Sequence, residues 1–283
     1  DQNTAVVALE NGEIDVLDTF PMSAKQSLID NEDLNYYETE AGLYYHISFN
    51  NAEGIFSNKK LRQAVSYAID REAIIEGAFE GAAVPVYCPM PPSVTGYVED
   101  FKGNEYNPEK AKELVAAAGY PDGVTVKMAT LESTSYTIPT EIIQAQLREV
   151  GINAEIEIME RGAFLSDVYD KCDYEISLVN IVCPVTDADF AVYGRLHSSM
   201  KGGGNNIQLC DIPELDELIM EARAEKDEEV RKEIYSEISE IVREEAILVP
   251  ICTNMSAVVA NKNLKGVEPS ATNYYYVYNY SWE

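Results

Sequence analysis

The chain has 283 residues, of which 46% are hydrophobic and 19 are tyrosine, and this composition predicts a packed core rather than a disordered chain. Asp and Glu number 49 against 21 Lys and Arg, which gives a formal net charge of -28. Because phosphate backbones and anionic lipid surfaces attract cationic proteins, this charge argues against nucleic acids and anionic membranes as partners. The sequence contains no run of about 18 apolar residues, the length that would predict a membrane span.

The chain opens on a predicted helix over residues 4–11, which ends at Gly12, where glycine tolerates the left-handed conformation of a helix C-terminus. Ile14 and Val16 then alternate as in a strand. A helix followed by a strand, with nothing before it to pair with, predicts that a part of the fold precedes the chain. A second β-rich run covers residues 43–51.

Residues 59–80 predict an amphipathic helix. Its apolar residues recur at the spacing i, i+3, i+4, i+7 and i+8, which indicates one buried face. They are Leu61, Ala64, Val65, Ala68 and Ile69. Lys60, Arg62 and Asp70 are expected to lie off this face. The pattern predicts a packed helix and no chemistry.

The next segments predict an α/β architecture. Four prolines within residues 85–92 predict a stiffened connection, and the following helix starts with Asn107 as its cap and ends at Gly119. Residues 123–159 have the strand, helix, strand pattern of a parallel βαβ unit.

The remaining predicted elements complete the chain. They are a short helix over 162–169, a strand over 174–182 that is apolar enough to be buried on both faces, a helical hairpin over 213–246, and strands over 247–254 and 273–280.

The search for catalytic chemistry yields little. The two histidines, His46 and His197, lie in no metalloprotease or nucleophile-elbow motif, and the glycines at 202–204 lack the spacing of a phosphate or dinucleotide loop. Asp187 and Asp189 resemble the carboxylate pair of a glycoside hydrolase, but close acidic pairs are expected by chance among 49 acids. We therefore predict no enzyme, no cofactor and no metal site.

The five cysteines are Cys88, Cys172, Cys183, Cys210 and Cys252. They are odd in number and widely spaced, which predicts buried free thiols rather than a disulfide framework or a zinc site.

The order of motifs resembles a known family. Residues 56–72, FSNKKLRQAVSYAIDRE, look like the helix shared by the family 5 extracellular solute-binding proteins, the oligopeptide, dipeptide and nickel receptors of ABC importers. Further motifs follow in the family's order. They are GEIDV before that helix and GAAVPVYCPMPP, YNPEKAKELVAAAGYPDG, QAQLREVGINAEI, GGNN, PELDELIMEA and REEAILVPI after it.

The resemblance implies the C-terminal half of such a protein, whose members have two α/β lobes hinged around a buried ligand. The expected fold is α/β, a periplasmic-binding-protein-like class II lobe with a mixed sheet flanked by helices. Residues 47–254 would form this second lobe. Residues 1–46, which enter the hinge, and residues 255–283, which return, would belong to a mostly absent first lobe.

In the family, a strand with the pattern GW, two residues, D, two residues, DP lies against the ligand, and its first Asp takes a peptide's α-ammonium. The matching segment here is NIVCPVTDAD, residues 180–189, but Pro184 stands at that Asp position and Ile181 replaces the Trp. An unpaired buried ammonium costs several kcal/mol, so a free peptide N-terminus lacks its anchor unless Asp187 or Asp189 replaces it. The candidate ligand-binding residues are Asn180, Ile181, Val182, Cys183, Pro184, Asp187 and Asp189.

The implied function is capture without catalysis. The chain would belong to the substrate-binding component of an ABC importer that takes oligopeptides outside the membrane. We expect a monomer, extracellular or periplasmic, with ABC permease subunits as partners and a lipid anchor outside this chain. The alternatives are a non-peptide ligand such as a nickel chelate, for which His197 lies nearby, a sensor without transport, and a hydrolase.

Overall fold

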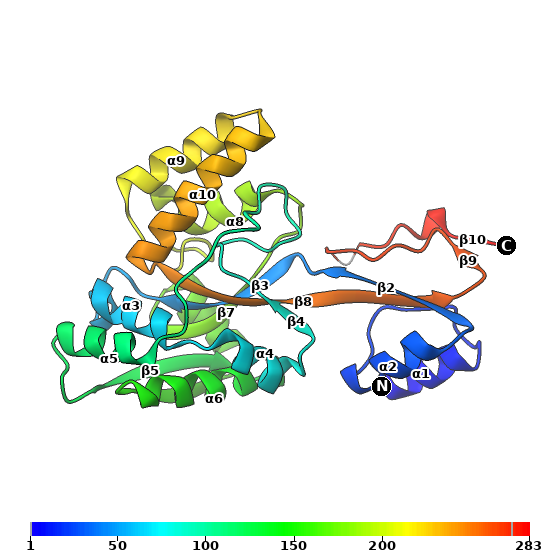
Figure 1. The fold of residues 1–283 in the computed structure, drawn as a ribbon, viewed down its shortest axis with the longest axis horizontal. Coiled ribbons are helices and arrows are strands. Elements are labelled where there is room, and N and C mark those ends of the chain that lie inside the picture. Colours follow the sequence, from blue (N-terminus) through cyan, green and yellow to red (C-terminus); the bar gives the residue numbers. More distant parts are fainter. Residues whose placement is uncertain (1, 273) are drawn as a thin grey trace.

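A mixed sheet with helices on both faces forms the main body of the computed structural model, which describes residues 2–272 and 274–283 (Figure 1). The strand order is β1-β8-β3-β7-β5-β6, and β2 and β4 pair with β8. The strands are β1 (Val16–Leu17), β2 (Leu34–Glu40), β3 (Leu43–Phe49), β4 (Ala83–Pro85), β5 (Val124–Leu131), β6 (Ile152–Met159), β7 (Ile176–Val182) and β8 (Leu248–Asn261). The predicted α/β class with a mixed sheet is confirmed.

Two groups of helices cover the sheet (Figure 1). One face packs against α3 (Lys59–Ala68), α4 (Arg71–Phe79), α5 (Pro108–Ala117) and α6 (Thr134–Glu149). The other packs against α8 (Ala188–Leu196), α9 (Pro213–Ala224) and α10 (Glu228–Glu245). A short α7 (Arg161–Phe164) continues into a π-helical turn, Leu165–Asp170, in place of the predicted helix over 162–169.

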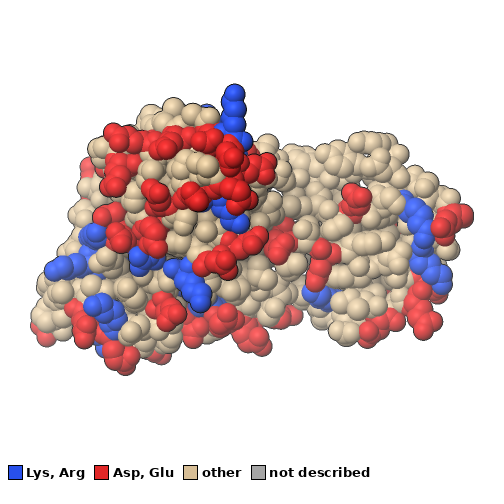
Figure 2. All heavy atoms as spheres, turned by 45° about the horizontal axis from the view of Figure 1, so that its top comes forward, with Lys and Arg blue, Asp and Glu red and all other residues tan. Residues whose placement is uncertain are grey.

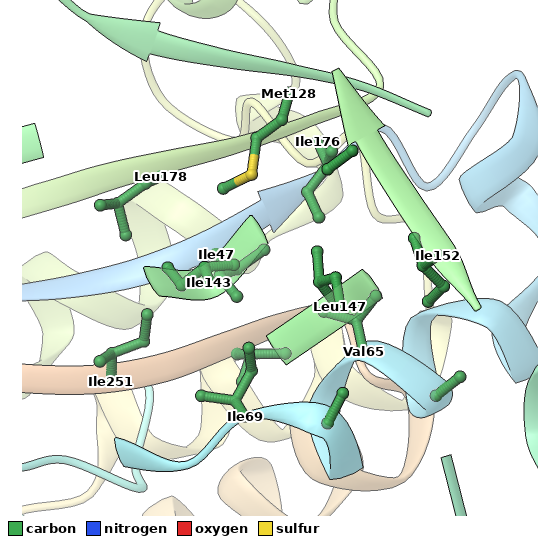
Figure 3. Packing of buried hydrophobic residues seen from close by; sticks show 14 of the residues in the cluster. Ile47, Val65, Ile69, Met128, Ile143, Leu147, Ile152, Ile176, Leu178 and Ile251 are labelled. Atoms are coloured by element: carbon green, nitrogen blue, oxygen red, sulfur yellow. The ribbon is translucent and has the colours of Figure 1, made fainter. Parts of the chain in front are cut away.

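The largest core lies between the sheet and the first group of helices (Figure 3). Ile47, Met128 and Leu178 of the sheet face this layer, and Val65 of α3 and Leu147 of α6 pack onto them. All five residues of the predicted apolar stripe at 61–69 are fully buried. Burial of each large aliphatic side chain contributes about 1.5–3 kcal/mol.

The prediction of one continuous helix over residues 59–80 is wrong, because this segment forms two helices. It breaks into α3 and α4 because Ile69 and Asp70 adopt extended backbone conformations, with ψ of 112° and 100°. The Asp70 carboxylate accepts a hydrogen bond from the N–H of Ala73 at 3.1 Å and so begins α4. An Asp side chain competes with the helix for backbone donors and is favoured at such starts.

The prediction that Arg62 lies off the buried face is also wrong. Its side chain is buried, and its guanidinium donates to the carbonyl oxygens of Phe56 at 2.8 Å, Glu245 at 2.8 Å and Ala246 at 3.1 Å. The last carbonyls of a helix need donors from elsewhere. Arg62 supplies them to the end of α10, a role that periodicity in one helix does not reveal.

The predicted βαβ unit is confirmed. β5 and β6 are parallel, in register from Val124 opposite Ile152 to Leu131 opposite Met159, and α6 connects them. The helical hairpin of α9 and α10 is confirmed too. The strand over 174–182 exists as β7, but the prediction of burial on both faces fails at its end, where Val182 is 53% exposed.

The part expected to belong to a first lobe extends along the second half of β8 (Figure 1). Residues 248–252 of β8 pair with β3, whereas residues 255–261 pair with β2, so the partner changes between Cys252 and Met255. The predicted boundary 46/47 falls inside β3, which pairs with β7 over its whole length. This part also holds α1 (Gln2–Glu10), α2 (Lys25–Asp30), β9 (Leu264–Lys265) and β10 (Ser281–Trp282).

The strand predicted over residues 273–280 is wrong for the described residues. A 3-10 turn, Val277–Asn279, precedes the two-residue β10, while Asn273 lies outside the described residues. Consecutive tyrosines have strand propensity, but propensity yields to tertiary context. As predicted, all five cysteines are free and buried. Among the described helices, none combines the length and the hydropathy that crossing a bilayer requires.

Candidate ligand-binding site

The end of β7 presents its side chains to two different sides of the sheet. β7 pairs with β3 in antiparallel register, with Asn180 opposite Tyr45 and Val182 opposite Leu43. Opposite residues share a face, and Tyr45 belongs to the core on the α6 side. Ile181 points the other way and is buried in the core under α8 to α10. The exposed surface of this strand end therefore comes from Asn180 and Val182.

A cluster of uncharged polar groups lies beside Asn180. The Tyr45 side chain is only 5% exposed. Burial raises the pKa of Tyr45, and the polar side chains of Ser135, Asn254 and Asn180 near its hydroxyl partly oppose that rise. The Oδ1 atom of Asn254 is buried and, among the described residues, accepts no hydrogen bond. The four side chains of this cluster are neutral hydrogen-bonding groups.

Three chain segments meet at Gly42, where the chain passes from β2 to β3. The Cys183 N–H donates to the Gly42 carbonyl at 2.6 Å, and the Gly42 N–H donates to the Ala271 carbonyl at 2.6 Å. A Cβ at Gly42 would lie 3.0 Å from both the Ala271 and the Cys183 carbonyl oxygens. The segment after β7 is thus connected through Gly42 to the return segment, residues 255–283, and Gly42 has little room for a side chain.

Cys183 is buried, and burial raises the pKa of its thiol to about 12. The thiol is therefore neutral at physiological pH and unsuited to nucleophilic chemistry. Pro184, which follows, is exposed and has no N–H to donate.

Asp187 is paired with an arginine, although 43% of its side chain is exposed. Its two carboxylate oxygens accept from Arg231 of α10, at 2.6 Å and 3.0 Å, and Oδ1 also accepts from the Asp189 N–H at 2.8 Å as the cap of α8. Burial would raise the pKa of Asp187, but the hydrogen bonds from Arg231 and the Asp189 N–H lower it below its ordinary value. The carboxylate is fixed in its charged, paired form.

Asp189 is paired as well. Its Oδ1 lies 3.1 Å from Nε of Arg223 in α9, and the Arg223 guanidinium lies 3.8 Å from the centre of the Tyr193 ring. Oδ1 makes this ion pair without an aligned hydrogen bond. Burial raises the pKa of Asp189, and the charge of Arg223 opposes the rise.

The structure thus brings together only some of the predicted site residues. Asn180 and Val182 face the α6 side, whereas Asp187 and Asp189 are held by the helical hairpin on the other side of the sheet. Sequence reasoning missed the partners on both sides because they come from distant segments and carry no local motif. They are Tyr45, Ser135, Asn254, Arg223 and Arg231.

His197, proposed for a metal chelate, sits at the end of α8. Its Nδ1 accepts from the Ser199 N–H at 3.1 Å and lies 3.7 Å from Asp216. Within residues 2–272 and 274–283, no group of three or more His, Cys, Asp or Glu is arranged to hold a metal ion.

The molecular surface is strongly acidic in one region. Figure 2 shows Asp and Glu gathered over the end of the molecule that carries α9 and α10. The larger cavities lie away from the end of β7. One of about 540 Å³ includes Asp15, Tyr275 and Trp282 in its lining, and another of about 430 Å³ includes Lys127 and Glu157. The candidate site is therefore an open surface at the strand end rather than one of these cavities.

Comparison with known proteins identifies the family. Residues 1–203 match the family described as bacterial extracellular solute-binding proteins, family 5. This match covers more than half of the chain, and the chain belongs to this family.

Individual relatives agree with this assignment. The glutathione-binding protein GsiB of Salmonella paratyphi A is 28% identical over 274 residues, which cover 94% of this chain and 53% of that protein. The structure of HbpA2 from Haemophilus parasuis matches with a TM-score of 0.91 and 25% identity, over all of this chain and 56% of that one. DppA from Helicobacter pylori, solved with the peptide STSA, matches with a TM-score of 0.81 and 27% identity, over 95% and 52%.

The chain therefore spans about half the length of the relatives it matches. The fold of that half is the class II periplasmic-binding-protein lobe with strands of a further lobe attached, as predicted. GsiB and DppA are named for binding rather than for catalysis.

Proposed function

We propose that this chain is the ligand-capturing lobe of the substrate-binding component of an ABC importer, with oligopeptides as cargo. The observation that carries the proposal is the open end of β7, where exposed Val182 and the neutral cluster around Tyr45 lie next to the junction at Gly42. Family membership and the peptide-bound relative DppA support it.

The backbone at this strand end suits an extended ligand. β7 pairs with β3 along one edge and with β5 along the other, but β5 pairs only with Ile176 and Ser177. At residues 180–183 the second edge of β7 is therefore no longer paired with β5. An unpaired strand edge offers N–H and C=O groups that an extended peptide can use, and its main-chain hydrogen bonds would be independent of side-chain identity. We assign this role to the remaining backbone groups of Asn180, Ile181, Val182 and Cys183. Two of their groups are already used, because the Cys183 N–H donates to the Gly42 carbonyl at 2.6 Å and the Asn180 carbonyl accepts from the Tyr169 hydroxyl at 3.3 Å.

The mechanism is capture without catalysis. The first lobe would include residues 1–46 and 255–283. It would close over the end of β7 by a hinge movement at Gly42 and Asn254, where the chain passes between the two lobes. Closure buries the ligand between two surfaces and excludes water, which strengthens its hydrogen bonds. The protein would act outside the membrane as a monomer, held by a lipid anchor beyond this chain, and would deliver cargo to ABC permease subunits.

The test is mass spectrometry of the small molecules released when the complete protein, purified from its own host, is denatured. We expect a mixture of short peptides, with sequences that vary because backbone groups dominate recognition. Residues 1–283 prepared in the same way serve as the control and should release far less. A single non-peptide compound or a metal chelate in place of peptides would refute the assignment of the cargo.

A further inference from the structure

We propose that Arg161 binds a carboxylate of the cargo and gives this lobe a preference for peptides that carry a negative charge beyond the end of β7. The inference rests on the proposed function and specifies the cargo of the same site. Three features of the structure support it: the place of Arg161 at the edge of the sheet, its unpaired charge, and the ring contacts that connect its helix to the neutral cluster around Tyr45.

Arg161 lies at the same edge of the sheet as the candidate ligand-binding residues 180–183. β5 is parallel to both β6 and β7, so the carboxyl ends of these three strands lie at one edge. Val182 is the last residue of β7, and Arg161 follows Met159, the last residue of β6, with only Glu160 between them. Ligands of open α/β sheets bind beyond the carboxyl ends of the strands. A ligand at the end of β7 therefore shares this edge with Arg161.

The spacing of the strands matches a short peptide. β5 lies between β7 and β6 in the sheet. Neighbouring strands are about 4.8 Å apart, so roughly 10 Å or more separates the end of β7 from the end of β6. Each residue of an extended chain spans about 3.3 Å. A ligand of about three residues would therefore reach from Val182 to the region of Arg161.

The Arg161 side chain is exposed and carries a charge that no acid of the protein neutralises. Among the described residues, the arginines that form ion pairs are Arg223, Arg231 and Arg243, so Arg161 has no carboxylate partner there. This is notable in a chain with 49 acids against 21 Lys and Arg. A guanidinium presents a planar fork of donors that suits both oxygens of a carboxylate.

Ring contacts connect the helix of Arg161 to the neutral cluster. The Tyr136 ring lies edge-on to Tyr45, with 5.7 Å between the ring centres, and edge-on to Phe164 of α7 at 6.3 Å. Tyr45 belongs to the core on the α6 side and Phe164 to a core on the other face, so Tyr136 bridges the two faces. Burial raises the pKa of Tyr136, and the charge of Arg161 partly opposes that rise. The guanidinium therefore acts on a ring that contacts Tyr45.

A further contact connects the same helix to β7. The Phe164 ring centre lies 6.0 Å from that of Tyr169, whose hydroxyl donates to the Asn180 carbonyl at 3.3 Å. α7 is thus packed against groups that reach both Tyr45 and β7, and it begins at Arg161. This packing fixes the position of Arg161 relative to the end of β7.

The acids at this edge make the preference depend on Arg161. Glu132 follows β5, Glu160 follows β6, and both are exposed. The Glu160 carboxylate accepts from the Gly162 N–H at 2.8 Å as the cap of α7. Because like charges repel, these acids would disfavour a cargo carboxylate in the absence of a cation. Arg161 therefore decides the sign of the preference.

The test uses the complete binding protein and isothermal titration calorimetry with three probes. Trialanine carries a terminal carboxylate, trialanine amide carries none, and the amide of alanyl-alanyl-glutamate carries a side-chain carboxylate. We expect at least one carboxylate probe to bind at least tenfold more tightly than trialanine amide. The probe that shows the preference identifies the source of the carboxylate.

Substitutions then assign the preference to Arg161. In R161Q it should fall at least tenfold, to none or to a preference for trialanine amide. R161K, which keeps the charge and loses the fork, should retain a preference of at least threefold. The matched control is R148Q, an exposed arginine at the end of α6, near Gly123 and Gly151 at the amino ends of β5 and β6. It removes the same charge from the opposite edge and should leave the ratio within twofold.

A measurement on the wild type needs no substitution. A rise in NaCl from about 0.05 M to about 0.5 M screens exposed charges and should weaken the preference at least threefold. Equal binding of all three probes by the wild type, or an unchanged ratio in R161Q, would overturn the role of Arg161 while leaving peptide capture intact. If no probe binds the wild type, the peptide cargo itself is refuted, and this inference falls with it.

Discussion

His46 lies on β3, at the centre of the sheet, where both faces of the strand are covered. Burial lowers the pKa of His46 to about 3, and the positive charge of Arg195 adds to the effect. Its Nε2 contacts Nε2 of Gln208 at 3.2 Å. A lone histidine on a strand is more often a structural residue than a base, and this environment agrees, because the imidazole stays neutral at physiological pH. It is not fully satisfied, since its buried Nδ1 has no hydrogen-bond partner among the described residues.

The buried histidine makes stability depend on pH. Since the folded pKa is below the unfolded value of about 6.5, the unfolded chain takes up a proton that the folded chain does not, and stability is lost as the pH falls from 6.5 toward 3. Between pH 7.5 and pH 5.0, this linkage should lower the free energy of unfolding by about 2 kcal/mol.

Urea unfolding of the wild type and of H46Q at both pH values measures this contribution. The carboxylates titrate in both proteins, so the difference between the two pH responses isolates the histidine. An equal pH response in H46Q would show that the buried imidazole is not responsible.

At the scale of elements, short polar side chains set where helices begin. The five apolar residues of the stripe at 61–69 are buried as predicted, yet the chain leaves the helix at Ile69 because the Asp70 side chain bonds to the backbone of the next turn. The apolar periodicity predicts the buried face of this segment. It does not predict that Asp70, within the same segment, ends one helix and caps the next.

Removing this cap should destabilise the protein. D70A leaves the Ala73 N–H without its acceptor, and we expect the free energy of unfolding to fall by about 1 kcal/mol, as for other Asp caps. Urea unfolding provides the measurement. The matched control is D100A at an exposed position, which should change stability by less than about 0.5 kcal/mol. Equal stability of D70A and D100A would mean that α4 begins without help from Asp70.

At the scale of the whole molecule, β8 connects the sheet of the main lobe to the smaller part. Its first half pairs with β3 and its second half with β2, so one continuous strand links the two parts (Figure 1). The return segment contacts the same junction through Ala271 and Gly42. A ligand at the end of β7 would contact only this lobe until another surface closes over it.

We therefore expect residues 1–283 alone to bind oligopeptides at least about a hundredfold more weakly than the complete protein, a loss of about 3 kcal/mol. The reason is that a buried site takes its affinity from groups on both of its walls. Calorimetry with the peptides recovered from the host measures both affinities. Equal affinities would show that this lobe holds the whole site.

The sequence by itself determined the local features of this protein. The βαβ unit, the helical hairpin and the free cysteines follow from spacing and composition within short windows, and the ordered motifs pointed to the family. These features depend on neighbours along the chain, which a sequence displays directly.

Only the tertiary structure decided the chemistry around residues 180–189. Asp187 and Asp189 were candidates for a ligand's ammonium, and their pairing with Arg231 and Arg223 depends on how α8 packs against the hairpin. The burial of Arg62 has the same origin, because its acceptors lie at the far end of α10. Whether a charged group is free or paired depends on contacts between distant segments, and no local pattern in a sequence encodes those contacts.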